Sequence, residues 1–295
     1  MASIREIRRR IKSIQKIQQI TKAMKMVATV KYKRAYSALT GARPYATKIN
    51  EIVSDLAERI ENVRHPFISK GKDVFKSKED RKSNKIILVV ITGDKGLCGS
   101  FNSNILKRAL SILNELKNSD ISLLLIGKKA RDFFNKQNFK VKNTYISLST
   151  PVPYNTAEKI ASELINSYLS DGIDDVFLIY NKFKTVMTQT LVYEKLLPIS
   201  EPKKSYSRKT EHLYEPSSKE IFDKLLPAYI KFRFYSALLE SNASEHGARM
   251  NMMDQANKNA EDMISGLTLL FNKARQASIT KELTEISTSA EAIRI

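Results

Sequence analysis

Apolar residues recur every three or four positions at the start of the chain, which predicts a long amphipathic helix. These residues are Ile4, Ile7, Ile11, Ile14, Ile17, Ile20, Met24 and Val27. Their spacings of 3, 4, 3, 3, 3, 4 and 3 are typical of a coiled-coil seam, with a stammer near Ile17 that would overwind the supercoil locally. Ser3 and Glu6 have the spacing of a capping box, so we expect the helix to begin there.

The helical pattern continues beyond two residues that disturb helices. We expect Gly41 and Pro44 to kink the helix, and Ile49–Ile60 to resume its pattern. The residues from His65 to Asn84 are polar and rich in lysine, which is typical of a linker. A different kind of structure should therefore begin near Lys85.

The middle of the chain alternates short apolar strands with helices. We expect strands at Lys85–Thr92, Ile121–Ile126, Phe139–Ile146, Asp175–Tyr180 and Thr190–Leu197, and helices at Asn104–Leu116, Lys128–Gln137 and Thr156–Leu169. Continuous β-branched runs indicate strands buried on both faces. This order predicts an α/β domain, with a mostly parallel sheet and helices on both of its faces.

A second long helix is expected at the carboxyl end. Pro227 suits a first helical turn, and the pattern continues from Ala228 to Ile295, or roughly 100 Å of helix. Such a helix needs a partner, and the amino-terminal helix is the obvious one. We therefore expect an antiparallel coiled coil with the α/β domain inserted between its arms. The expected domains are residues 1–64, 65–205 and 206–295.

The distribution of charge along the chain indicates a class of partner. The formal net charge is +19, and residues 1–34 hold eleven cations against one acid, Glu6, which gives this segment +10. A stripe of one sign favours a polyanionic partner, such as nucleic acid, anionic lipid or an acidic protein. Cys98 is the one cysteine, so an intramolecular disulfide or a cysteine-based zinc site is excluded. The apolar runs are far shorter than the ~20 residues of a membrane-spanning helix.

Candidate catalytic residues are scarce. Gly93–Ser100 lies between a predicted strand and a predicted helix, where phosphate loops occur, but no Gly-Lys-Ser/Thr closes it and its glycines lack the dinucleotide-binding spacing. We interpret it as a structural turn. His65, His212 and His246 are scattered without metal-ligand spacing. We expect no catalytic residues, no cofactor and no metal.

Three stretches together resemble the gamma subunits of F-type ATP synthases. They are Ile20–Ala28, Asp94–Gly99 and Asn272–Leu283, with a fourth, Leu213–Pro216, that looks like the foot segment of the family. Lys95 stands where the family usually has arginine, and His212 where an aromatic residue is common. A regulatory insertion with paired cysteines is absent, so redox gating of that kind is not expected.

The resemblance implies a non-catalytic rotor whose terminal helices form a shaft inside a hexamer of alpha and beta subunits. It implies beta-subunit contacts at Lys22, Met24, Lys25, Arg275, Gln276 and Thr280. It implies contacts of His212 and Tyr214 with the epsilon subunit and the membrane-embedded c-ring. Neither nucleic acid nor a membrane span is expected, and the location implied is the cytoplasmic face of the bacterial plasma membrane.

Two other functions fit parts of the sequence. A basic coiled-coil protein that binds nucleic acid would explain the charge but not the stretch Asn272–Leu283. An enzyme built on the α/β domain would require that domain to bind a nucleotide.

Overall fold

The computed structural model describes residues 4–59, 65–69, 84–117, 119–200, 214–215 and 217–293. These residues form two compact units. One contains residues 29–249, and the other contains residues 1–28 and 250–295. Two long helices, α1 (Ile4–Arg59) and α5 (Ser218–Ile293), contribute residues to both units.

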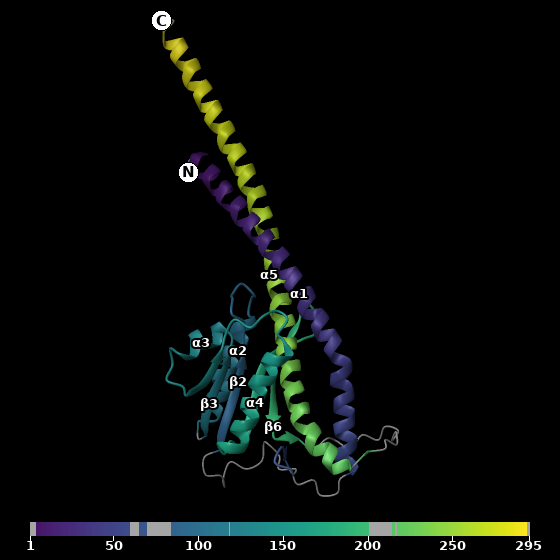
Figure 1. The fold of residues 1–295 in the computed structure, drawn as a ribbon. Helices are drawn as coiled ribbons and strands as arrows, with labels where there is room; N and C mark the ends of the chain where they lie inside the picture. Colours follow the sequence, from purple (N-terminus) through teal and green to yellow (C-terminus); the bar gives the residue numbers. More distant parts are fainter. Residues whose placement is uncertain are drawn as a thin grey trace. The chain divides into compact units, whose positions relative to one another are not determined.

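The unit of residues 29–249 is built around a five-stranded sheet (Figure 1). Its strands are β2 (Lys85–Ile91), β3 (Asp120–Ile126), β4 (Val141–Tyr145), β5 (Asp175–Phe183) and β6 (Gln189–Leu197), in the order β4-β3-β2-β5-β6. All neighbours are parallel except β5 and β6. The short strands β1 (Ile68–Ser69) and β7 (Ile199–Ser200) form a separate parallel pair. The predicted mostly parallel sheet is therefore confirmed.

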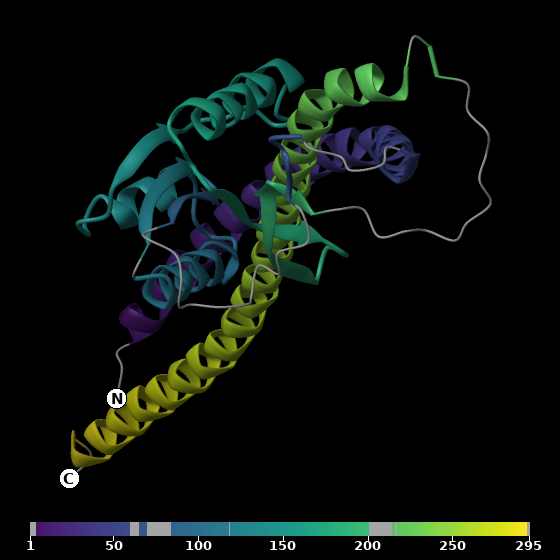
Figure 2. The same ribbon diagram turned by 90° about the horizontal axis from the view of Figure 1, so that it is seen from below.

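Helices cover both faces of the sheet because side chains alternate between its faces. Ile86, Leu88 and Val90 pack with helix α2 (Phe101–Glu115) and helix α3 (Lys128–Phe134). Ile87, Val89 and Ile91 belong to a second core, with α4 (Tyr154–Ser170), α1 and α5. Figure 2 shows α4 and α2 on opposite sides of the sheet.

Within this unit, α1 and α5 run antiparallel. Ala35 and Leu39 of α1 share a core with Leu239 and Ala243 of α5. Further along α1, the Asn50 side-chain oxygen accepts a hydrogen bond from the hydroxyl of Tyr229, at 2.9 Å. Residue numbers thus rise along α1 as they fall along α5, as the predicted antiparallel coiled coil requires.

The unit of residues 1–28 and 250–295 is a pair of antiparallel helices. Ser13 and Ile14 of α1 line one groove together with Gly266 and Leu267 of α5. Lys25 of α1 binds Asp254 of α5 at 2.6 Å. In Figure 1 the yellow end of α5 continues beyond the purple start of α1.

The predicted stammer is wrong. The residues of α1 that are shielded from solvent in this unit are Ile4, Ile7, Ile11, Ile14, Gln18, Thr21, Lys25 and Ala28, along with the half-buried Glu6 and Met24 at the flank. The first eight of these residues are spaced alternately three and four positions apart, as in an undisturbed heptad repeat. Ile17, Ile20 and Val27, which we had assigned to the seam, are 52%, 59% and 60% exposed. The first part of the seam is formed by isoleucines, but from Gln18 onward it passes mainly through polar and small residues, while Ile17, Ile20 and Val27 face outward.

The ends and interiors of the long helices also differ from expectation. Helix α1 is continuous through Gly41 and Pro44, so neither residue ends it, and the kink expected there stays a prediction. Helix α5 begins at Ser218, so Pro227 lies inside the helix and not in its first turn. Proline removes one backbone hydrogen bond from a helix interior, and packing compensates here, because Leu226 and Ile230 on either side are fully buried. The predicted capping residue Ser3 lies outside the described residues, and Glu6 pairs with Arg10 at 2.7 Å.

Candidate interaction surfaces

The outward face of α1 in the two-helix unit combines apolar and cationic side chains. Ile17, Ile20 and Val27 are exposed along one line of the helix, since residues three and four apart share a face. The same part of the helix also exposes many cations: Arg5, Arg8, Arg9, Lys12, Lys16 and Lys22. An apolar line of this kind costs free energy in water, about 25 cal/mol per Å², and is typical of a surface that meets another chain.

The carboxyl-terminal end of α5 is a second such surface. Its apolar side chains Leu269, Leu270, Ile279, Leu283 and Ile286 are between 48% and 66% exposed. Residues 281–289 are all exposed. A helix is rarely stable alone in water when its apolar side chains have nothing to pack against. The end of α5 is therefore suited to being enclosed by other protein.

The residues predicted to contact a beta subunit lie on α1 and on the end of α5, but not all of them lie on the outward faces. Lys22 is exposed and Met24 is half-buried. Arg275, Gln276 and Thr280 are exposed on the end of α5. Lys25 differs from the others, because its ammonium also binds Asp254 within the chain.

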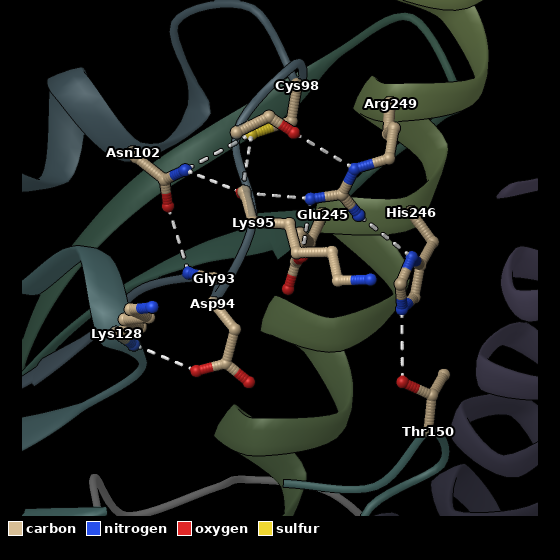
Figure 3. Close-up of polar contacts among 11 residues, drawn as sticks. Gly93, Asp94, Lys95, Cys98, Asn102, Lys128, Thr150, Glu245, His246 and Arg249 are labelled. Atoms are coloured by element: carbon tan, nitrogen blue, oxygen red, sulfur yellow. Dashed lines mark hydrogen bonds and ion pairs between the residues drawn. The ribbon is translucent and has the colours of Figure 1, made fainter. Parts of the chain in front are cut away.

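In the sheet-containing unit, the loop between β2 and α2 is attached to α5 by a buried polar cluster. We call Glu245, His246 and Arg249 the Arg249 cluster (Figure 3). Arg249 donates from Nη2 to the carbonyl oxygen of Lys95 at 3.0 Å and from Nε to that of Gly96 at 3.2 Å. It also binds the Glu245 carboxylate at 2.7 Å. One guanidinium thus joins two segments that lie more than 150 residues apart.

Electrostatics within the Arg249 cluster favour one protonation state of His246. Arg249 donates to Nδ1 of His246 at 3.1 Å, and a guanidinium has no acceptor, so Nδ1 must be unprotonated. The Nε2–H therefore donates to the Thr150 hydroxyl, also at 3.1 Å. Burial, followed by the nearby charges of Arg249 and Lys31, lowers the pKa of His246 to about 3. Burial raises the pKa of Glu245, and Arg249 opposes that rise.

Hydrogen bonds from side chains to the backbone hold the other side of the same loop in place. Asn102 accepts from the backbone N–H of Gly93 at 2.9 Å and donates to the carbonyl of Lys95 at 3.3 Å. Asp94 accepts from the N–H of Lys128, which begins α3, at 2.8 Å. A Cβ on Gly93 would lie 2.6 Å from the Glu245 carboxyl carbon, so a side chain here would collide with α5. The structural turn predicted for Gly93–Ser100 is thus a loop that packs against α5.

This packing blocks the place where nucleotides bind in related sheet architectures. In doubly wound sheets, ligands bind beyond the carboxyl ends of the strands, where the strand order reverses. Here that point lies between β2 and β5, next to Gly93. The Glu245 carboxyl group, held by Arg249, lies against Gly93 and fills the space beside it.

Of the two residues predicted to form the foot contact, Tyr214 is among the described residues. The Tyr214 hydroxyl donates to the carboxylate of Asp55 on α1 at 2.8 Å, and the ring packs against the larger core. His212 lies outside the described residues. Across the described ranges, no group of three or more His, Cys, Asp or Glu residues is arranged to hold a metal ion. None of the described helices is long and apolar enough to cross a membrane.

Comparison with known proteins places the chain in a family. Residues 3–293 match the family described as ATP synthase. The chain is 42% identical to the ATP synthase gamma chain of Pelotomaculum thermopropionicum, over 99% of this chain and 100% of that one. It is 43% identical to that of Geobacter sp. strain M21, over the full length of both. The chain belongs to the ATP synthase gamma family.

Solved structures agree with this assignment. The central stalk of the Tetrahymena thermophila mitochondrial ATP synthase, solved with its c-ring, matches 80% of this chain and 99% of the other, with a TM-score of 0.57 and 28% identity. A chain of the Euglena gracilis enzyme has the same fold, with a TM-score of 0.65 over 98% of this chain and 94% of that one, at 19% identity.

As a member of this family, the chain is a central-stalk subunit and is not itself catalytic. Family membership decides against the nucleic-acid-binding and enzyme hypotheses. Sequence reasoning missed two features of the structure, the Arg249 cluster and the Lys25–Asp254 pair. The Lys25–Asp254 pair could have been predicted from the sequence. Asp254 is an acid on α5, and an antiparallel pairing places it opposite a strongly basic helix.

Proposed function

We propose that the two-helix unit is the part of the rotor that turns inside a hexamer of alternating alpha and beta subunits. The observation that supports this most is the uneven surface of that unit. Ile17, Ile20 and Val27 expose an apolar line on α1 among cations, whereas the end of α5 is exposed on all sides. A shaft without threefold symmetry meets three identical beta subunits with three different surfaces. Each orientation then favours a different beta conformation through its differential contact energy.

Lys22, Met24 and Lys25 form the proposed contact with an acidic segment of a beta subunit. Exposure of Lys22 and the cations that surround it supports this contact. Lys25 has three N–H donors, so binding to Asp254 leaves donors for a partner. Exposed ion pairs are individually weak, at about 0.2–1 kcal/mol each. The contact therefore orients the shaft against the beta subunit more than it adds to the binding free energy.

Arg275, Gln276 and Thr280 form the proposed polar contact at the far end of the shaft. Apolar neighbours such as Ile279 can slide along an apolar sleeve, because hydrophobic contacts have no direction. A guanidinium can bind a carboxylate through two parallel N–H groups, which fixes an angle as well as adding energy. The exposure of Arg275 leaves it available for such a partner.

The unit that contains the sheet is the proposed foot, which meets the epsilon subunit and the c-ring through the region of His212 and Tyr214. The match to a central stalk solved with its c-ring supports this assignment. We assign residues 1–64 and 206–295 to the shaft helices and residues 65–205 to the foot domain. The bacterial relatives support a location on the cytoplasmic face of the plasma membrane, attached through the c-ring.

Reconstitution of the whole complex tests these contacts. The complex with Lys22→Glu and Lys25→Glu together should keep its assembly but synthesise ATP more slowly at a given ion gradient. Because Lys25 also binds Asp254, Lys22→Glu alone separates the contact with beta from the contact within the chain. Wild-type synthesis by both complexes would overturn the electrostatic contact.

A further inference from the structure

The seam between α1 and α5 has little to define its register around Lys25. From Gln18 to Ala28 the shielded residues of α1 are polar or small, apart from the half-buried Met24. The buried residues of the facing stretch of α5 are Ala260, which is small, and Met253, whose unbranched and flexible side chain adapts to different packing arrangements. Large interlocking side chains would lose many contacts on sliding, but small and polar ones lose few.

The Lys25–Asp254 pair lies within this weak part of the seam. Lys25 occupies a position of the regular heptad repeat, and its side chain is 41% exposed, against 35% for Asp254. The other pairs of this unit, Arg10–Glu6, Lys258–Asp254 and Lys281–Glu285, each lie within one helix. Lys25–Asp254 joins the two helices. Asp254 also has Lys258 at 3.8 Å, and both cations help to keep it ionised.

A buried polar atom lies about one helical turn from Asp254, so this part of the seam is not purely apolar. The side-chain oxygen of Asn257 is buried without a hydrogen-bond partner among the described residues. A polar residue at a seam position is a known means of specifying the register of a coiled coil, at some cost in stability. Sliding by one heptad would move the two charges about 10 Å apart along the axis.

We propose that Lys25 and Asp254 set the register of α1 against α5, so that Lys25 acts as a positioning residue within the shaft in addition to any contact with a partner. This inference depends on the antiparallel pairing of the helices and not on the proposed contact with beta. A fixed register aligns the exposed line of α1 with the end of α5, and the asymmetry of the shaft depends on that alignment. Lys25 is the one of the proposed contact residues with a described ion-pair partner on the facing helix.

Exchange of the two charges tests the proposal in the full-length chain. The variants are Lys25→Glu, Asp254→Lys and the two together. Register is read by cross-linking two cysteines, Ser13→Cys and Gly266→Cys, with a short bifunctional maleimide, in a chain that also has Cys98→Ala. Ser13 and Gly266 line the same groove, and a Cβ on Gly266 meets no atom within 4 Å, so the reporters fit.

Each single reversal should lower the cross-linking yield severalfold, and the double exchange should restore it. The matched control is Lys22→Glu, which makes the same change in charge at an exposed residue one turn away and should leave the yield unchanged. Circular dichroism of each variant separates a shift in register from a loss of helix. Loss of helix in the single variants with recovery in the double would also support the proposal.

Two results would overturn the proposal. One is a wild-type yield in both single variants. The other is a loss that the double exchange does not restore. The test is separate from the contact with beta, because Lys22→Glu should slow ATP synthesis in the complex without affecting cross-linking in the isolated chain. Failure of one test therefore leaves the other intact.

Discussion

The guanidinium of Arg249, on α5, hydrogen-bonds the carbonyl oxygen of Gly96, in the loop that follows β2, at 3.2 Å. The Arg249 side chain is 9% exposed and that of its partner Glu245 is 14% exposed. Directional bonds at a buried site resist sliding and rotation, whereas apolar contacts alone do not. This contact therefore fastens the sheet to α5 within the unit of residues 29–249, which suits a part that must transmit torque.

Removal of Arg249 should destabilise the chain strongly. Arg249→Met keeps much of the side-chain volume but leaves the buried Glu245 carboxylate without its cation, which typically costs about 3 kcal/mol or more. Urea unfolding measures the change. The matched control is Arg275→Met on the exposed end of α5, which should stay within about 0.5 kcal/mol of wild type. Equal effects of the two substitutions would contradict the role given to Arg249.

A methyl group on Gly93 should also be harmful. Gly93→Ala places a Cβ 2.6 Å from a carboxyl carbon that is itself held by Arg249, so α5 or the loop must move, at a cost of about 1–3 kcal/mol. The control is Gly41→Ala, where nothing lies within 4 Å in the middle of α1. That substitution should raise stability by about 0.5–1 kcal/mol, because alanine has the higher helix propensity. Thermal unfolding of the two variants should therefore shift in opposite directions.

Stability should fall in mild acid because His246 is buried in its neutral form. Its pKa is lowered from 6.5 to about 3, so between these values the unfolded chain binds a proton that the folded chain does not. Stability is then complete above pH 6.5 and is lost as the pH falls toward 3, by at most about 1.4 kcal/mol per pH unit.

His246→Gln should remove this contribution while keeping a polar side chain. Glu245 acts in the opposite sense, since its raised pKa lowers stability as the pH rises, but it is present in both proteins. The difference in unfolding free energy between wild type and His246→Gln, measured from pH 7 to pH 4, therefore isolates His246. A difference that does not change with pH would show that the ring is not held neutral.

The sheet was predictable from sequence, and the exact seam of the shaft was not. β2 and β3 are buried on both faces, and their continuous apolar runs predict buried strands of this kind. On α1 the apolar periodicity predicts that Ile17 and Ile20 lie in the seam, whereas Gln18 and Thr21 occupy it. Hydrophobic periodicity cannot separate a face that meets the chain's own helix from one that meets another protein. The Arg249 cluster was hidden for a different reason, because its partners lie far apart in sequence.

The polar contact at the end of α5 should be sensitive to charge. Arg275→Glu should impair assembly or lower ATP turnover in the complex, because a carboxylate cannot replace a guanidinium that binds an acidic partner. The helix content of the isolated chain should not change, since Arg275 is exposed. Arg275→Lys keeps the charge but loses the two parallel donors, so an intermediate loss is expected. Normal turnover by an intact Arg275→Glu complex would contradict the contact.

Rotation of this chain inside the reconstituted alpha–beta hexamer tests the central claim most directly. A probe attached through Met187→Cys, at the turn between β5 and β6, suits the measurement, because that side chain is 76% exposed and far in sequence from both ends. The Cys98→Ala background leaves one thiol to label. With the hexamer fixed to a surface, ATP should turn the probe in one direction, in steps that reflect the threefold arrangement of beta subunits. ATP hydrolysis at the normal rate with a probe that does not turn would contradict the account.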